Sequence, residues 1–593
     1  MVFFVKQNKN HFVKTRWFFC NQLILLSSHK KIVNSINQKS ITMKLSQSTK
    51  ILCFVCLTLF CFSTAIAQTL EQQIDEYLKA EYKANEPGVS FLIAKDGKPI
   101  YQKAFGMANL ELNVPMATTN VFEIGSITKQ FTAVAILMLE EQGKLKVEDD
   151  ITKYIPDYPT QGKKITIHQL LNHTSGIKSY TSMASFMKNA RTDMSPKELI
   201  DVFKNEPMDF DPGEQFLYNN SGYILLGYII EVVSGETYAD FIQKHIFDTL
   251  GMTSSSYGSM TNIVPNRASG YSESENGYQN AEYLSLTLPY AAGSIMSTTS
   301  DLLTWQKALN NYTLIKKASY EKAIHGSTLN NGEHITYGYG LGEENINGST
   351  SIQHGGGIFG YTTMGIYFPQ EKIFVSGLTN CDCKNITGVT TAIAAMAIGK
   401  PFPNKKDAIK LSETDAKKWV GTYQFEGNVV RYVTFENGQL FSQREGSTKL
   451  EIYPMSKTNF IFDGGNTSYE FSESNGKKQA KFTNNGTSII GNEIDKAPPV
   501  EKETITLSPE VLSQYTGKYE LAPGMVMDVT IKENQIFVQL TGQPQFEIFA
   551  EKADTFFLKV VVAQLVFDRN TEGKVTGVTL NQGGRQMPAK KIE

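Results

Sequence analysis

The chain has 593 residues, of which 41% are hydrophobic and 20% charged, and its formal net charge is −2. This composition is typical of globular proteins, and the length predicts about four domain-sized units. The near-zero charge and the lack of an extended basic run exclude a general polyanion binder, and the sequence contains no recognisable nucleic-acid-binding module.

Residues 43–67 have the pattern of a signal peptide. Lysines provide a positive start, residues 51–62 form an apolar core, and Ala65-Ile66-Ala67 is a small-x-small cleavage site. No cysteine of this segment follows a small residue, which disfavours lipid attachment. We therefore expect a periplasmic or secreted protein, cleaved after Ala67, without a stable membrane span in its mature form.

Residues 1–42 are basic and aromatic and show no domain pattern. We interpret them as an extension from an upstream start, with Met43 as the true first residue. The alternative is that they are translated and that the apolar stretch remains as an uncleaved anchor, although it is short for a membrane span.

Only Cys381 and Cys383 remain in the mature chain. A pair separated by one residue is awkward for an unstrained disulfide, and two cysteines are too few for a structural zinc site. We expect both to be small packed residues, with a strained redox pair as the alternative. The sequence predicts no cofactor and no metal.

The mature chain begins with a helical pattern over residues 70–82. An apolar alternation over residues 89–93 and its return over residues 100–105 then predict a β-hairpin.

A serine and a lysine three residues apart, Ser126 and Lys129, then open an apolar helical stripe that ends at Gly143. Residues three apart share a helix face, so the Lys129 amine would take the Ser126 proton if burial lowered its pKa. The helix N-terminus would also favour a developing oxyanion.

This spacing is a weak signal by itself. Several other Ser/Lys pairs show it, among them Ser319 and Lys322. The structural alternative is an N-cap serine beside a solvated lysine.

Further stretches of the chain are informative. A capped helix from Ile165 leads to His173, which we interpret as a structural histidine, with a catalytic base as the alternative. Tyr218-Asn219-Asn220-Ser221 precedes an apolar helix closed by Gly235, and Asn220 or Ser221 could simply cap that helix while Tyr218 lies in the core.

A stretch rich in small residues precedes a helix that Thr299 or Ser300 could cap. Residues 337–342 suggest a strand near a crowded site, and His354 is followed by three glycines that allow a ligand to approach the backbone. Residues 373–378 then predict a strand and 389–399 a helix.

Three motifs in order resemble the serine β-lactamase-related family, which includes class C β-lactamases, low-molecular-weight penicillin-binding proteins, D-aminopeptidases and esterases. They are Ser126-Ile127-Thr128-Lys129, Tyr218-Asn219-Asn220 and His354-Gly355-Gly356. The likeness covers about residues 70–400. It implies an α+β fold, with an antiparallel sheet flanked by helices and an all-helical region.

The resemblance also implies residue roles. Ser126 would be acylated, Lys129 would help take its proton, and Tyr218 would act as general base and then acid. Asn220 would bind the substrate amide, and His354 and Gly356 would line the substrate site. The backbone N–H groups of Ser126 and Gly357 would form the oxyanion hole.

One position departs from the family pattern. Most β-lactamases and penicillin-binding proteins have a lysine where this chain has His354, and members with histidine include D-aminopeptidase-like and esterase-like hydrolases. Because histidine is largely neutral at pH 7, an anchor for a substrate carboxylate is weakened. The sequence therefore favours cleavage of an amide or ester over efficient β-lactam hydrolysis.

The C-terminal third is β-rich and internally repeated. Gly421-x-Tyr423 matches Gly517-x-Tyr519, and one constant offset relates three phenylalanines of each half. Each copy opens with a short helix, and Asn437-Gly438 marks a hairpin turn. We expect two small β-barrel domains that resemble lipocalin-like domains.

The predicted organisation is an extension (1–42), a signal peptide (43–67), a hydrolase domain (68–400), a linker (401–406) and two repeats (407–497 and 498–593). The function we favour is an exported serine hydrolase acting through an acyl-Ser126 intermediate on a small-molecule or peptide amide or ester. The alternatives are a penicillin-binding or cell-wall-fragment-sensing protein with slow turnover, and a protein whose barrels bind a lipid or partner.

Overall fold

The computed structural model describes residues 69–593, except 275, 485–486, 499–503, 523–524, 542, 544 and 583–584. The signal peptide and the extension predicted from the sequence lie outside the described residues. Within the described part of the chain, no helix is long and apolar enough to cross a membrane.

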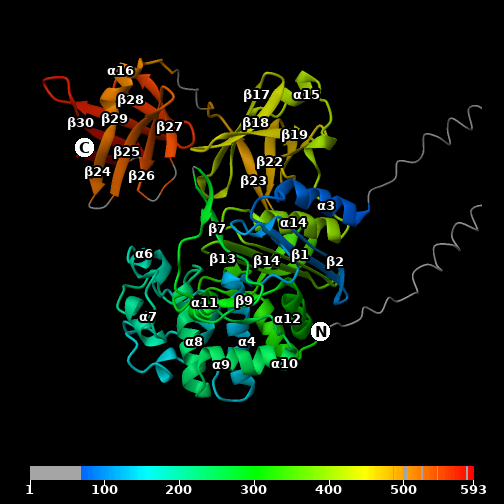
Figure 1. Ribbon diagram of the computed structural model, residues 1–593. Helices are drawn as coiled ribbons and strands as arrows, with labels where there is room; N and C mark the ends of the chain where they lie inside the picture. Colours follow the sequence, from blue (N-terminus) through cyan, green and yellow to red (C-terminus); the bar gives the residue numbers. More distant parts are fainter. Residues whose placement is uncertain are drawn as a thin grey trace, which may run out of the picture. The chain divides into compact units, whose positions relative to one another are not determined.

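The first part of the chain is built on a six-stranded antiparallel sheet with the order β12-β13-β14-β15-β1-β2 (Figure 1). The predicted hairpin is confirmed as β1 and β2, and it joins the four later strands where β1 pairs with β15. The strands are β1 (Val89–Lys95), β2 (Lys98–Phe105), β12 (Gly342–Ile346), β13 (Ser349–Ile358), β14 (Tyr361–Phe368) and β15 (Ile373–Thr379).

Helices cover both faces of this sheet, which explains why β1 is apolar at almost every position. Phe91 packs in a cluster with α3 (Leu70–Glu81) and α14 (Ile386–Ala397). Its neighbour Leu92 points the other way, into a cluster with α4 (Thr128–Glu141) and α12 (Thr299–Asn310).

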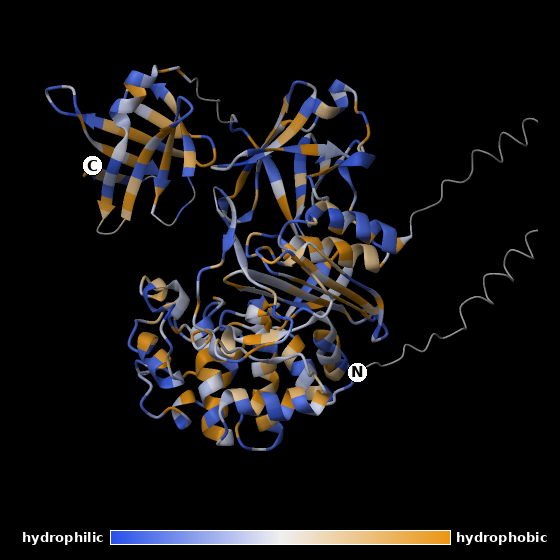
Figure 2. Ribbon diagram, in the orientation of Figure 1, coloured by the Kyte–Doolittle hydropathy of each residue, from blue (hydrophilic) through white to orange (hydrophobic). Residues whose placement is uncertain are grey.

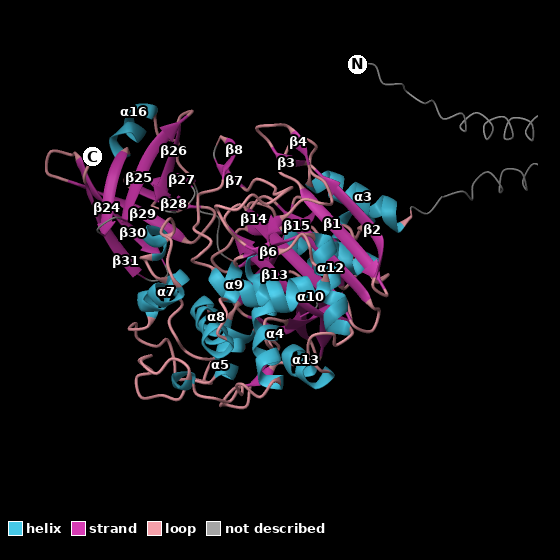
Figure 3. Cartoon of the chain, turned by 60° about the horizontal axis from the view of Figure 1, so that its bottom comes forward, coloured by secondary structure: helices cyan, strands magenta, loops and turns pink. Residues whose placement is uncertain are grey.

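A helical region lies next to the second face, as the gathered cyan helices of Figure 3 show. Its central helix, α8, contacts α4, α5, α7, α9 and α11 and is buried from Ser221 to Gly227. The helices of this region and its surroundings are α5 (Ile167–Leu171), α6 (Phe186–Asn189), α7 (Pro196–Phe203), α8 (Asn220–Ser234), α9 (Tyr238–Ile242), α10 (Asp248–Leu250), α11 (Tyr290–Gly293) and α13 (Lys317–Ile324).

Short strands complete this part of the molecule. The three-stranded sheet β5-β9-β6 leads into the segment around Ser126. The short strands are β3 (Met107–Asn109), β4 (Val114–Pro115), β5 (Phe122–Glu123), β6 (Ser256–Tyr257), β7 (Tyr271–Ser274), β8 (Gly277–Asn280), β9 (Ile295–Ser297), β10 (Ser327–Thr328) and β11 (His334–Ile335).

The residues that the sequence offered as possible caps of two helices are not the residues that cap them. Asn219, not Asn220 or Ser221, caps α8 by accepting from the Gly222 N–H. Thr298, rather than Thr299 or Ser300, caps α12. In both cases neighbouring residues of similar capping propensity compete, and tertiary contacts decide between them.

The strand predicted over residues 337–342 is also wrong. Tyr337 and Gly342 form only an isolated bridge, and the segment between them is a loop. Gly340 has a φ of +67°, and its Cα packs so tightly on the Lys129 carbonyl that a Cβ would lie 2.7 Å from the oxygen. Alternating tyrosine and glycine residues imitate a strand pattern, but this contact requires a left-handed residue.

The C-terminal region forms two closed eight-stranded barrels, which confirms the predicted repeat. The repeated tyrosine has the same position in both: Tyr423 and Tyr519 are fully buried, and their hydroxyls donate to the carbonyls of Trp419 and Tyr515. Asn437 and Gly438 both have positive φ, as the predicted hairpin turn requires.

Each barrel is preceded by a short helix, α15 (Glu413–Lys417) or α16 (Pro509–Leu512). Apolar and polar residues alternate along the barrel strands (Figure 2). The strands of the first barrel are β16 (Gly421–Gln424), β17 (Val430–Glu436), β18 (Gln439–Arg444), β19 (Lys449–Pro454), β20 (Asn459–Ile461), β21 (Thr467–Ser474), β22 (Lys477–Asn484) and β23 (Thr487–Ile494).

The second barrel repeats this order. Its strands are β24 (Gly517–Ala522), β25 (Met525–Lys532), β26 (Gln535–Leu540), β27 (Gln545–Lys552), β28 (Thr555–Leu558), β29 (Ala563–Arg569), β30 (Val575–Gln582) and β31 (Arg585–Lys591).

Candidate active site

Ser126 and Lys129 lie where a tight turn passes into α4. Ser126 is the middle residue of a 3-10 turn over Gly125–Ile127, and Lys129 is in the first turn of the helix that follows. The Lys129 Nζ is 3.0 Å from the Ser126 Oγ. The spacing of three residues thus brings the amine against the hydroxyl, as a shared helix face requires.

The Lys129 side chain is completely buried, and desolvation lowers its pKa well below the usual value. Its Nζ also lies 2.9 Å from the Asn220 Oδ1 and 2.8 Å from the Ala292 carbonyl oxygen. Both of these atoms only accept hydrogen bonds. A neutral amine would donate its two protons to them and direct its lone pair at the Ser126 hydroxyl.

Asn220 is the first residue of α8, and its side chain is free to face Lys129 because Asn219 caps the helix. The Asn220 Nδ2 donates to the Thr181 hydroxyl at 3.0 Å. This bond fixes which end of the amide faces the lysine.

Tyr218 lies in the segment before α8, and His173 holds this segment on both sides. The His173 carbonyl accepts from the Leu217 N–H, and its Nδ1 accepts from the Asn219 N–H at 3.1 Å. The His173 ring lies 4.3 Å from the Tyr218 ring, centroid to centroid. His173 is fully buried, and desolvation lowers its pKa well below the ordinary value. Its contacts hold the backbone on both sides of Tyr218, which fits the structural interpretation.

The Tyr218 phenol lies close to both members of the Ser–Lys pair. The Lys129 Nζ is 4.8 Å from the centre of its ring. Although 37% of the residue is exposed, burial of the hydroxyl end raises its pKa, and hydrogen bonding to Ser126 offsets part of the rise.

His354 lies near Tyr218, with 6.2 Å between the ring centres. Its Nδ1 is 2.6 Å from the Gly355 carbonyl oxygen and its Nε2 is 2.9 Å from the Tyr337 hydroxyl. The carbonyl can only accept, so the proton is on Nδ1 and Nε2 accepts from Tyr337. Desolvation and the nearby Lys129 lower the His354 pKa to about 4, and the ring is neutral at pH 7.

The glycines after His354 have different surroundings. A Cβ on Gly356 would lie 2.0 Å from the Ile124 carbonyl oxygen, so β13 passes directly over the segment that carries Ser126. A Cβ on Gly125 would lie 2.9 Å from the Gly357 nitrogen. Gly357 has open space at its own Cβ position and lines the cavity described next.

Ser126 opens into a cavity of about 350 Å³. Asn220 and Gly357 also line it, whereas Lys129, Tyr218, His354 and Gly356 are not among its lining residues. The remaining lining residues are mostly apolar or small: Gly125, Tyr180, Thr181, Phe186, Leu284, Pro289, Ala292, Gly293, Ile358, Phe359, Thr362 and Asp382.

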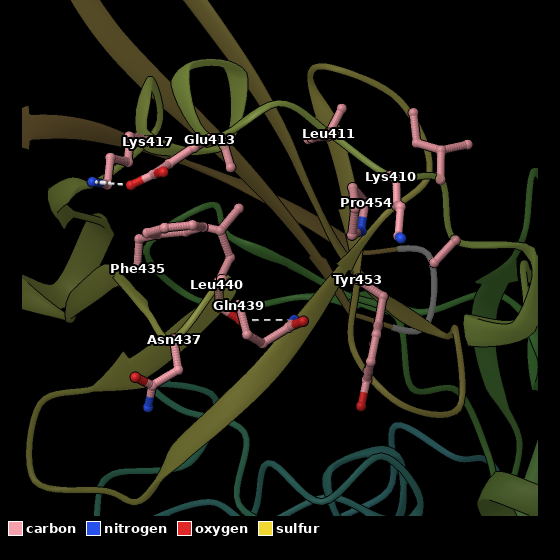
Figure 4. Close-up of a pocket in the computed structure, with 14 residues that line it drawn as sticks. Lys410, Leu411, Glu413, Lys417, Phe435, Asn437, Gln439, Leu440, Tyr453 and Pro454 are labelled. Atoms are coloured by element: carbon pink, nitrogen blue, oxygen red, sulfur yellow. Dashed lines mark hydrogen bonds and ion pairs between the residues drawn. The ribbon is translucent and has the colours of Figure 1, made fainter.

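A larger hollow of about 720 Å³ lies on the first barrel (Figure 4). Lys410, Gln439 and Tyr453 line it, together with the exposed Glu413–Lys417 ion pair. None of its lining residues is a candidate catalytic residue, so it is not the candidate active site.

The interpretation of the two cysteines as unbonded packed residues is wrong, because Cys381 and Cys383 form a disulfide. Their Cα atoms are 5.1 Å apart, within the usual range for a disulfide. A fully extended segment with one intervening residue would hold them about 6.6 Å or more apart, at or beyond the upper end of that range. The turn that brings them together was not visible in the sequence.

Sequence reasoning missed several residues of the site. Thr181 orients Asn220, Tyr337 fixes the His354 tautomer, and Asp382 reaches the cavity from between the two cysteines. None belongs to a motif that marks it. Within the described residues, no three histidine, cysteine or acidic side chains are grouped so that they could hold a metal ion.

Fold and site together define a serine–lysine site in a β-lactamase/transpeptidase-like domain. A family model described as Beta-lactamase matches residues 66–396, and the chain belongs to this family. A second model, a domain of unknown function (DUF3471), matches residues 501–591, in the second barrel.

Known proteins resemble the chain over most of their length. Penicillin-binding protein 4* of Bacillus subtilis is 32% identical over 406 residues, which cover 64% of this chain and 89% of that protein. The octameric penicillin-binding protein homologue from Pyrococcus abyssi is 28% identical, with a TM-score of 0.50 over 71% of this chain and 99% of that one.

The D-amino acid amidase from Ochrobactrum anthropi SV3, in its complex with L-phenylalanine amide, shares the fold. Its TM-score is 0.50 at 22% identity, over 55% of this chain and 99% of that one.

Proposed function

We propose that the protein is an exported serine hydrolase that cleaves an amide or an ester through an acyl-Ser126 intermediate. The observation that carries this proposal is the buried Lys129 amine, 3.0 Å from the Ser126 Oγ, with both of its other polar contacts to pure acceptors. A lysine in this setting is suited to take the serine proton, because burial disfavours its charged form.

In the proposed reaction, the Ser126 Oγ attacks the substrate carbonyl and gives its proton to the Lys129 amine. The N–H groups of Ser126 and Gly357 stabilise the oxyanion, and Asn220 binds the substrate amide. The Tyr218 phenol passes the proton to the leaving amine or alcohol. Water then attacks the acyl-enzyme by the reverse proton route and releases the acid.

His354 bears on the substrate class. A neutral ring with both nitrogens engaged offers no cation to a substrate carboxylate. This favours a D-aminopeptidase-like or esterase-like activity over efficient β-lactam hydrolysis or D,D-carboxypeptidase action.

A panel of an acyl ester, a D-amino acid amide and a chromogenic cephalosporin tests the proposal. We expect turnover of the ester or the amide, slow or no turnover of the cephalosporin, and loss of all activity in Ser126→Ala. Undiminished turnover in folded Ser126→Ala would reject the proposal.

The second candidate is a penicillin-binding protein with slow or no turnover, favoured by the 32% identity to a protein of that name. It predicts a long-lived penicillin adduct on Ser126, visible by intact mass spectrometry, without hydrolysis of the ester or amide. For the barrels we propose packing or ligand-binding roles, tested by deleting residues 401–593 and measuring activity and cellular function.

A further inference from the structure

Asp382 is the only charged residue among those that line the cavity at Ser126. The lining includes no lysine, arginine or histidine, and the nearby Lys384 is already paired with Glu86 at 3.0 Å. The cavity therefore has a negative rim over a largely apolar wall.

The Asp382 carboxylate is anchored through one oxygen and open at the other. Its Oδ2 accepts from the Gly360 N–H at 2.8 Å and from the Ser272 hydroxyl at 2.7 Å. Its Oδ1 has no hydrogen-bond or ion-pair partner among the residues that the structure describes, and the residue is exposed. Two hydrogen-bond donors on Oδ2 fix the orientation of the carboxylate, and Oδ1 is then available to accept from a ligand.

The backbone around Asp382 is also held. The Cys381–Cys383 disulfide closes the chain on both sides of it. The Cys381 carbonyl accepts from the hydroxyl of Thr362, a residue of β14 that also lines the cavity. A carboxylate fixed in this way recognises a cation at little entropic cost.

We propose that Asp382 is a specificity-determining residue that selects amide or ester substrates carrying a protonated amine. The amine binds the Asp382 Oδ1, the hydrocarbon part lies against apolar residues such as Phe186 and Leu284, and the carbonyl is presented to Ser126. This inference rests on the proposed function, and it names the charge of the substrate. A substrate anion is disfavoured at the same place, because it would meet a carboxylate.

The test compares three p-nitroanilides that share a phenylalanine scaffold, each in D and L form: one with a free amine, one N-acetylated and one N-succinylated. In the wild-type protein we expect the kcat/KM of the free amine to exceed that of the N-acetyl form by about tenfold, the size of one hydrogen bond to a charged group. Asp382→Asn keeps the size of the side chain and should bring this ratio close to one. Asp201→Asn, an exposed carboxylate outside the cavity, is the matched control and should keep the wild-type ratio.

Binding provides a readout without turnover. Phenylalanine amide and its N-acetyl derivative are titrated calorimetrically into Ser126→Ala and Ser126→Ala/Asp382→Asn. We expect only the free amine to lose affinity, by about tenfold, in the double variant. An unchanged ratio in Asp382→Asn, or a preference for the N-succinyl substrate, overturns the role of Asp382 even if the enzyme is active. If the protein turns over none of the substrates and a fluorophosphonate does not label Ser126, the proposed hydrolase function itself is rejected.

Discussion

Replacing Lys129 with methionine separates the chemistry of the buried amine from its packing. Methionine is unbranched and similar in length, so it fills most of the same space. The variant lacks the amine that lies 3.0 Å from the Ser126 Oγ. We expect kcat/KM to fall by about a thousandfold, within the range of a general base, or about 4 kcal/mol of transition-state stabilisation.

The stability of Lys129→Met should change far less. The substitution removes the cost of burying an amine but leaves the Ala292 carbonyl and the Asn220 Oδ1 without that donor. Each unpaired acceptor costs about 1–3 kcal/mol, which the relieved desolvation partly offsets. Urea unfolding should therefore show a folded variant whose free energy of unfolding lies within about 3 kcal/mol of the wild-type value.

The pH dependence of stability gives a further check. The folded state releases the Lys129 proton well below pH 10.5, whereas the unfolded chain keeps it until about that pH. The unfolded state therefore binds more protons in this window, and wild-type stability rises with pH up to about 10.5 relative to Lys129→Met. The slope of this difference is at most about 1.4 kcal/mol per pH unit.

The chain supplies its own control, because Ser319 and Lys322 have the same sequence spacing. In the structure Ser319 donates to Glu141, and Lys322 lies 3.3 Å from Glu140. Lys322→Met should leave kcat/KM within about twofold of wild type. If folded Lys129→Met keeps more than a tenth of the wild-type activity, the reasoning about the buried amine is refuted.

Three further predictions follow from the described contacts. The His354 pKa of about 4 lies below its ordinary 6.5, so the unfolded state takes up its proton first as the pH falls, and the free energy of unfolding should drop by about 3 kcal/mol between these pH values. Urea unfolding at several pH values should show a smaller drop in His354→Asn, and an identical pH profile in the variant would contradict this. Gly356→Ala should lower the free energy of unfolding in urea by roughly 2 kcal/mol or more, because its Cβ would meet the Ile124 carbonyl. Gly357→Ala should fold normally and lower kcat/KM by narrowing the cavity, and equal stabilities of the two variants would refute the contrast. Tyr423→Phe removes the donor to the Trp419 carbonyl and should destabilise the first barrel by about 1–2 kcal/mol in thermal unfolding, where no change would count against the bond.

Local patterns predicted much of the fold. The apolar alternation of β1 and β2, the helix after Ser126 and the repeated tyrosines of the barrels all follow from periodicity and turn chemistry. The repeat offset holds through Phe567. In the first barrel Phe471 pairs with Ala480, and in the second Phe567 pairs with Val578. The hairpin between these partners is therefore two residues longer in the second barrel, and the constant offset ends there.

Contacts between distant segments decided the rest. Asn219 rather than Asn220 caps α8 because the Asn219 side chain also donates to the Ile177 carbonyl. This leaves Asn220 for Lys129. No local pattern distinguishes two consecutive asparagines, so the sequence could not choose between them.

In the candidate site, too, local motifs identified some residues, and contacts between distant segments determined the others. The sequence named Ser126, Lys129 and Tyr218, whose side chains lie together, although their catalytic roles remain predictions. It did not find Tyr337 or Asp382, because a hydrogen bond to a histidine and a free carboxylate oxygen on a cavity rim depend on tertiary placement.

The acyl-enzyme itself gives the most direct test. An ester substrate is mixed with the protein, the reaction is quenched in acid during turnover, and the digested protein is mapped by mass spectrometry. We predict the substrate acyl group on Ser126, with no adduct in Ser126→Ala and a normal adduct in Ser319→Ala. Steady turnover with the acyl group on another residue, or with equal activity in Ser126→Ala, would contradict the account.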